Sequence, residues 1–180
     1  MYIETERLII RDFHEEDWRE LYTYASDAKV MEYIPEGVFN EEAAMKFVKD
    51  NMTDARNYPV IMKENSQLAG HIVFHPYFGT HTYEIGWVMN PHFHNRGIAS
   101  EAAYAVLKHG FEQMNLHRII ATCQPENIAS FKVMERIGMR REGFFKKCIP
   151  HGDGWWDEYY YAILGEEWLQ NHTAAVMEDD

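Results

Sequence analysis

The residues best placed for chemistry lie in the stretch "WVMNPHFHNRGIASEAAYAVLKHGF", residues 87–111. A strand-like run stops at Pro91, and a short loop with Gly97 leads into an alanine-rich amphipathic helix. The first N–H groups of a helix have no intrahelical partners, and with the helix dipole they attract anions, phosphate above all. Gly97 lacks a Cβ, so a ligand can approach the backbone, and Arg96 adds positive charge. The junction therefore predicts a phosphate-binding loop; the alternative is a simple tight turn into a helix.

The elements on either side must hold this loop, and hydrophobic periodicity predicts where they lie. Helices are expected at residues 15–28, 40–55, 98–115 and 128–137, with Asn40 as an N-cap and Gly138 just after the last helix. The pattern indicates an α+β or mixed α/β domain, with hairpins first and a strand–helix–strand–helix unit in the second half. Strands are expected at residues 7–13, 58–64, 68–77, 82–89, 117–124, 140–149 and 157–164.

Composition narrows the class of protein. The 180 residues, 46% hydrophobic and 14% aromatic, suit one globular domain, which we expect at residues 1–169, before a flexible acidic tail at 170–180. The net charge of −12 argues against non-specific nucleic-acid binding and is compatible with a cationic substrate. The sequence has no apolar run long enough to cross a bilayer, no secretory signal pattern and only two cysteines. We therefore expect a cytoplasmic protein with no membrane partner.

The loop and its surroundings resemble one known family. "PHFHNRGIASEA" (residues 91–102) is similar to the R/Q-x-x-G-x-G/A signature of the GNAT superfamily of N-acetyltransferases, whose loop holds the pyrophosphate of acetyl-coenzyme A (acetyl-CoA). His94 stands where the family usually has Gln, Arg or Trp, which allows a pH-dependent contact. The resemblance covers residues 3–168 and is closest to the ribosomal-protein N-terminal acetyltransferase subgroup. Four more segments match in order: "IETERLIIRDFHEED" (3–17), "YEIGWVM" (83–89), "NIASFKVMERIGMRREG" (127–143) and "DEYYYAIL" (157–164).

The resemblance implies a fold and a cofactor site. The GNAT fold has a central, mostly antiparallel twisted sheet of about six to seven strands, with about four flanking helices. Two central strands, here residues 82–89 and 117–124, splay apart in a V and take the pantetheine arm of acetyl-CoA between them. The residues implied in cofactor binding are Val88, Met89, His94, Asn95, Arg96, Gly97, Ile98, Ala99, Ser100, Asn127, Ser130 and Lys132.

The resemblance also implies catalytic roles, each beside a plainer alternative. Glu84 is the first candidate for the base that deprotonates the acceptor amine, although it could be an ordinary exposed strand carboxylate. The Met89 backbone N–H would polarise the thioester carbonyl, and Ser130 would orient the leaving sulfur. Asn127 would hydrogen-bond the cofactor arm, or serve only as the N-cap of its helix. Lys132 would reach a phosphate, or remain a solvated helix charge.

Several features of the sequence stay open or are set aside. The acceptor is expected to be a primary amine, either a protein N-terminus or a small amine such as a polyamine or aminoglycoside. A catalytically silent acyl-CoA-binding sensor is the alternative to an enzyme. "HGDGWWDEYYY" (151–161) could wall the acceptor site or be a hairpin that buries one face. We expect no metal, because His71 and His75 lie on a strand and are too far apart. An exposed edge strand could pair two subunits into a homodimer.

Overall fold

The computed structural model describes residues 1–177, with side chains as far as residue 171, and the chain forms two compact units. Unit 1 comprises Met1–His75 and Ile85–Val106, and unit 2 comprises Pro76–Glu84 and the chain from Leu107 onward. Three elements contribute residues to both units: β4 (Leu68–Phe78), β5 (Thr82–Met89) and α3 (Ile98–Glu112).

Unit 1 contains the antiparallel part of the sheet that leads up to the loop. β1 (Ile3–Glu4) pairs with β2 (Leu8–Ile10), and β2 pairs with β3 (Asn57–Met62). β3 pairs in turn with β4, with Asn57 opposite Val73. The expected hairpin of residues 58–77 is therefore confirmed. The helical elements of this unit, besides the start of α3, are η1 (Glu15–Asp17), α1 (Trp18–Ala25), α2 (Glu41–Thr53) and η2 (Pro91–Phe93).

Side-chain hydrogen bonds of Asn40 and Asp17 mark the starts of two helical segments in unit 1. Asn40 accepts a hydrogen bond from the Ala43 N–H at 2.8 Å, so α2 starts at the predicted N-cap. The single helix expected at residues 15–28 is instead a short 3-10 turn followed by α1, which ends at Ala25. Asp17 accounts for the tight first turn, because it accepts from the His14 N–H at 2.7 Å. The core of the unit comprises Phe13, Leu21, Tyr24, Ala25, Met31, Phe39, Ala44, Val48, Ile61, Leu68 and Val88.

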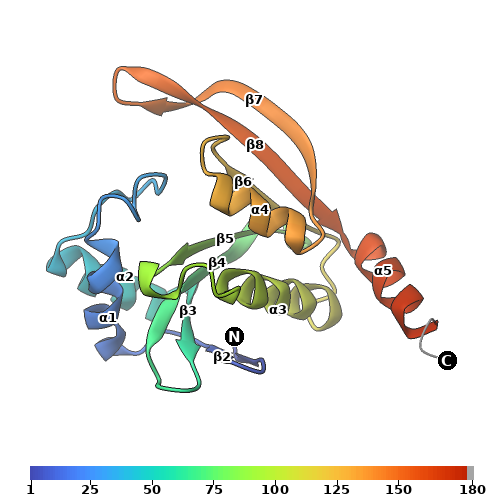
Figure 1. The fold of residues 1–180 in the computed structure, drawn as a ribbon, viewed down its shortest axis with the longest axis horizontal. Helices are drawn as coiled ribbons and strands as arrows, with labels where there is room; N and C mark the ends of the chain where they lie inside the picture. The colour runs from blue at the N-terminus through green and yellow to red at the C-terminus, as the bar shows by residue number, and fades with distance from the viewer. Residues whose placement is uncertain (178–180) are drawn as a thin grey trace. The chain divides into compact units, whose positions relative to one another are not determined.

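Unit 2 is built around β6 (Arg118–Cys123). Thr82–Glu84 of β5 pairs in parallel with Arg118–Ile120, and β6 pairs antiparallel with β8 (Gly154–Leu164). β8 pairs antiparallel with β7 (Arg140–His151), a long hairpin drawn in orange in Figure 1. The remaining helices are α4 (Ile128–Arg136) and α5 (Gly165–Met177).

The mixed α/β class is confirmed, but the described chain has eight strands and five α-helices, more than expected. β1 was missed because two residues are too short to show a period. α5 runs to Met177 and so includes the first part of the segment predicted as a tail; residues 178–180 lie outside the described chain. Trp168 anchors α5, since it is buried, stacks on Phe111 at 5.5 Å and donates from Nε1 to Glu112 at 3.3 Å. The V-shaped splay beyond the pairing of β5 with β6 stays a prediction.

Candidate functional site

The predicted phosphate loop forms a sharp backbone turn in unit 1. η2 ends at Phe93, Asn95 and Gly97 adopt left-handed conformations with φ of 58° and 75°, and α3 begins at Ile98. The Gly97 carbonyl already accepts from the Glu101 N–H at 3.0 Å, so Gly97 lies at the start of the helical hydrogen-bond ladder. Gly97 is exposed, and without a Cβ it leaves its own backbone open to a ligand. The first turn of α3 can therefore present N–H groups to an anion.

The end of β5 is tied to this loop. The Asn90 N–H donates to the Ala69 carbonyl of β4 at 2.9 Å, and the Asn90 side chain accepts from the His92 N–H at 3.1 Å. His94 Nε2 lies 3.1 Å from the Met89 carbonyl oxygen. A carbonyl only accepts, so Nε2 carries the proton in this contact. His94 thus reaches back to the strand end and couples the loop to Met89.

Gly70, which sequence reasoning missed, allows β4 and β5 to approach closely at this point. A Cβ at Gly70 would lie 2.4 Å from the Val88 carbonyl oxygen and 2.8 Å from Met89 Sδ. The φ of 155° at Gly70 is also one that side-chain-bearing residues rarely adopt. The strand end that carries Met89 therefore depends on a glycine in the neighbouring strand.

The predicted residues at the end of β5 present their backbone rather than their side chains. The Val88 side chain packs into the core of unit 1, and Met89 is buried against Gly70. Any contact of Val88 with a cofactor would therefore come from its peptide group. Ile98 is likewise buried, whereas Ala99 and Ser100 in the same turn are half-buried.

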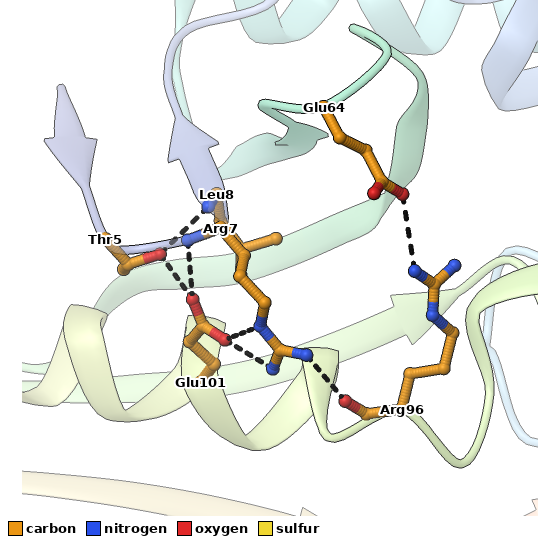
Figure 2. Close-up of polar contacts among 6 residues, drawn as sticks. All are labelled: Thr5, Arg7, Leu8, Glu64, Arg96 and Glu101. Atoms are coloured by element: carbon orange, nitrogen blue, oxygen red, sulfur yellow. Dashed lines mark hydrogen bonds and ion pairs between the residues drawn. The ribbon is translucent and has the colours of Figure 1, made fainter.

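The Arg96 side chain has a partner away from the loop. Its Nη2 lies 3.3 Å from Glu64 Oε1 in the β3–β4 turn (Figure 2). Its guanidinium also lies 5.6 Å from the Phe93 ring centroid. The Arg96 carbonyl accepts a hydrogen bond from Arg7, a residue that sequence reasoning did not assign to the site. The quoted segment "IETERLII" contains Arg7, but nothing in its local pattern points to residue 96.

In unit 2, the predicted residues gather at the end of β6 and the start of α4. Asn127 caps α4, because its side-chain oxygen accepts from the Ser130 N–H at 3.2 Å. Ser130 and Asn127 are half-buried, and Lys132 is exposed. Burial is the main influence on the Cys123 thiol and raises its pKa to about 11. A hydrogen bond with the Ser130 side chain acts in the opposite direction and lowers this pKa. Cys123 is thus a buried neutral thiol and not a nucleophile.

Glu84 lies half-buried in β5 where this strand pairs with β6, opposite Ile120. It stands at the last pair of the parallel ladder, and its role as the base stays a prediction. His71, by contrast, is buried in unit 1, and its Nδ1 lies 2.8 Å from the hydroxyl of buried Tyr24. Among residues 1–177, no three His, Cys, Asp or Glu side chains come together as a metal site. In the same residues, no helix combines the length and the apolar composition needed to cross a bilayer.

Comparisons with known proteins agree with this arrangement. Residues 7–140 match the family profile described as "Acetyltransferase (GNAT) domain". The chain is 65% identical over 169 residues to the uncharacterized N-acetyltransferase YnaD of Bacillus subtilis, which covers 93% of this chain and 99% of that protein. A crystal structure of a GNAT-family acetyltransferase from Bacillus anthracis has a TM-score of 0.91 and 65% identity, covering 93% of this chain and all of the other.

More distant structures share the fold alone. A ribosomal alpha-N-protein acetyltransferase, RimL, solved with coenzyme A, has a TM-score of 0.82 at 20% identity and covers 93% of this chain and 99% of its own. A spermidine N-acetyltransferase from Vibrio cholerae, solved with coenzyme A and spermine, has a TM-score of 0.79 at 18% identity, covering 92% and 99%. Proteins named for two different kinds of amine thus share this fold.

Proposed function

Since the chain belongs to the GNAT family of N-acetyltransferases, we propose that it moves the acetyl group of acetyl-CoA to a protein N-terminal amine. The amine attacks the thioester carbon directly, the C–N bond forms, and the C–S bond breaks to release coenzyme A. The attacking amine gives up one proton and the departing sulfur accepts one. Acetyl transfer itself follows from the family; the identity of the acceptor and the residue roles below are the proposal.

One observation carries the cofactor assignment, the backbone turn at residues 94–98. Two left-handed residues, Asn95 and Gly97, precede a helix of 15 residues, and Gly97 is exposed. Such a turn offers several peptide N–H groups and the positive end of a helix dipole to one anion. These donors support the assignment of the turn to the pyrophosphate of acetyl-CoA.

The reaction needs a neutral amine, and Glu84 is the proposed base. An α-amine has an unperturbed pKa of about 8 and a lysine amine of about 10.4, so both are mostly protonated at neutral pH. Glu84 can take this proton directly or through a water molecule. Its position in β5, paired opposite Ile120 at the edge of the parallel ladder, supports this role.

The other proposed roles fall to one backbone group and two side chains. The Met89 N–H would stabilise the oxyanion that develops on the thioester carbonyl, and the contact of His94 with the Met89 carbonyl supports a fixed strand end there. Ser130 would orient the sulfur, for which its hydroxyl, held beside Cys123, is suited. Asn127 already serves as an N-cap, so any bond to the cofactor arm would use its remaining hydrogen-bonding capacity.

Thiol release from acetyl-CoA with two acceptor pools tests the proposal. Short peptides with free N-termini form one pool, and polyamines with aminoglycosides form the other. Release with peptides supports the proposed acceptor, whereas release with small amines alone overturns it and leaves the acetyl transfer intact. Silence with both pools, while coenzyme A still binds, would favour the sensor reading over the enzyme.

The variant Glu84→Gln tests the base. We expect kcat to fall about a hundredfold, as for loss of a general base, with unchanged affinity for coenzyme A. Measurements of kcat from about pH 6 to 9 should show the deficit most strongly at low pH, where the amine carries its proton. Wild-type turnover across that range would remove Glu84 from the mechanism.

The predicted homodimer also stays a proposal. β7 lies at one edge of the strand order in unit 2, and an edge strand has unpaired backbone groups that a second copy could use. The molar mass in solution decides between a monomer and a dimer.

A further inference from the structure

Arg7 lies behind the phosphate loop, although it is far away in the sequence. Its Nη1 donates to the Arg96 carbonyl at 3.0 Å, across 89 residues of chain (Figure 2). A Cβ built on Gly97 would lie 3.7 Å from Arg7 Nη2, so the guanidinium also runs alongside the next residue of the loop. One side chain from the β1–β2 turn thus lies against two consecutive residues of the phosphate loop, Arg96 and Gly97.

Glu101 on α3 holds this guanidinium in place. Arg7 Nε donates to Glu101 Oε2 at 2.6 Å and Nη2 lies 2.5 Å from the same oxygen, while the Arg7 N–H donates to Oε1 at 3.2 Å. The Thr5 hydroxyl donates to Oε1 at 2.5 Å and itself accepts from the Leu8 N–H at 2.9 Å. Figure 2 shows these contacts converging on one carboxylate. The Glu101 carboxylate therefore accepts hydrogen bonds from both the main chain and the side chains of the β1–β2 turn.

The Arg96 carbonyl fixes the direction of the next N–H. The peptide bonds of the described chain are trans, and in a trans peptide the C=O and the following N–H point in opposite directions. With the Arg96 carbonyl held by Arg7, the Gly97 N–H points away from Arg7. Gly97, with φ of 75°, is a residue at which such a peptide flips easily, because glycine accepts either sign of φ. A flipped peptide would turn a carbonyl oxygen toward the anion and repel it.

We propose that Arg7 is a positioning residue for the cofactor: clamped by Glu101, it holds the Arg96–Gly97 peptide with its N–H directed at the pyrophosphate. This inference rests on the proposed cofactor role of the loop. Arg7 acts through the backbone and does not itself contact the phosphates. The arrangement predicts that cofactor affinity depends on an ion pair outside the binding surface.

The test uses two acetyl donors and a matched control. Arg7→Gln should raise the Kd for coenzyme A about tenfold or more, the scale expected for a lost charge-assisted hydrogen bond, and raise KM for acetyl-CoA with kcat changed less than about twofold. S-acetylpantetheine has no pyrophosphate, so its turnover should be the same in Arg7→Gln as in the wild type. Arg11→Gln breaks a comparable ion pair with Asp17, at 2.7 and 3.0 Å, and should leave the Kd for coenzyme A unchanged.

Glu101→Gln separates positioning from direct phosphate contact. If Arg7 positions the peptide, loosening its clamp should weaken coenzyme A binding about threefold to fivefold, a part of the Arg7→Gln effect. If Arg7 instead contacts the phosphates, removal of the competing carboxylate should tighten binding, and that result would overturn the proposal. This comparison still decides if Arg7→Gln fails to fold.

The proposed function can fail separately from this inference. A wild-type protein that does not bind coenzyme A would refute the loop assignment itself. A wild-type protein that binds it, with Arg7→Gln binding equally well, would refute only the positioning role. Equal losses with acetyl-CoA and S-acetylpantetheine in Arg7→Gln would show general structural damage and would also overturn it.

Discussion

The β5–α3 loop of unit 1 and the β7–β8 hairpin of unit 2 are held in different ways. The loop is bonded by residues distant in sequence, such as Arg7, which donates to Arg96 across 89 residues. The hairpin pairs mainly with its own strands and has register shifts near Gly143 and Ile149. Three of its aromatic side chains face solvent: Phe144, Phe145 and Trp155 are 48%, 49% and 58% exposed.

The difference indicates which region tolerates change. A backbone anion site binds its ligand only if each peptide keeps its orientation, so contacts from residues distant in sequence must hold that orientation. An aromatic surface binds through side chains and can vary without affecting a ladder of hydrogen bonds. We therefore expect substitutions at the loop side to affect cofactor binding or stability, and substitutions on the hairpin to affect only acceptor choice.

The largest effect is expected at Gly70. Gly70→Ala places a methyl group 2.4 Å from the Val88 carbonyl and forces an unfavourable φ, so the free energy of unfolding should fall by about 4 kcal/mol. Gly86→Ala on β5 is the control, because its Cβ would meet Val73 at an ordinary 3.4 Å and should cost about 1 kcal/mol or less. Urea denaturation measures both; equal losses would contradict the close approach of β4 and β5.

The next effect is the acid sensitivity of the unit 1 core through His71. Burial lowers the pKa of His71 to about 4, so the folded protein keeps this group neutral, whereas the unfolded chain takes up the proton near pH 6.5. The contribution of neutral His71 to the free energy of unfolding is complete above about pH 6.5. It declines as the pH falls toward 4, by about 3 kcal/mol in total.

Urea denaturation of the wild type and His71→Gln near pH 7 and pH 4 measures this contribution. Between pH 7 and pH 4, the free energy of unfolding of the wild type should fall by about 3 kcal/mol more than that of His71→Gln. His81→Gln, at an exposed histidine, should keep the wild-type pH dependence. The same pH dependence in all three proteins would exclude His71 as the cause.

A comparable effect, on binding rather than stability, is expected at Gly97. Gly97→Val should weaken coenzyme A binding about a hundredfold, which corresponds to about 2.7 kcal/mol, because the side chain blocks the backbone and strains the turn. Gly37 has a similar φ of 68° with open space around it, so Gly37→Val has the same strain without the blocked site. Calorimetry should find the wild-type affinity for coenzyme A in Gly37→Val. An unchanged affinity in Gly97→Val would exclude the loop as the pyrophosphate site.

The smallest effect on stability is expected on the hairpin. Trp155→Ala removes an exposed side chain, so the free energy of unfolding should change by about 0.5 kcal/mol or less. The affinity for coenzyme A should stay the same. If the hairpin walls the acceptor site, KM for the amine should rise severalfold. An unchanged KM would leave the hairpin as the plain strand pair that the sequence also allowed.

Local patterns in the sequence predicted most of the elements. The apolar run of β5, the Asn40 cap of α2 and the turn at Gly97 each depend on a few adjacent residues, and all three lie where expected. The prediction failed where an element was too short or depended on a distant anchor. β1 has two residues, and α5 is secured by Trp168, whose partners are 56 and 57 residues away.

The same division applies to the candidate site. By itself the sequence determined the glycine turn into α3 and the order of the family segments, because turn and helix signals act between neighbouring residues. Only the tertiary structure decided that His94 bonds to the Met89 carbonyl, that Gly70 lets β5 approach, and that Arg7 and Glu101 hold the loop. No pattern in either segment signals a contact between residues 94 positions apart, as Arg7 and Glu101 are. Such contacts arise only when the sheet brings the two segments together.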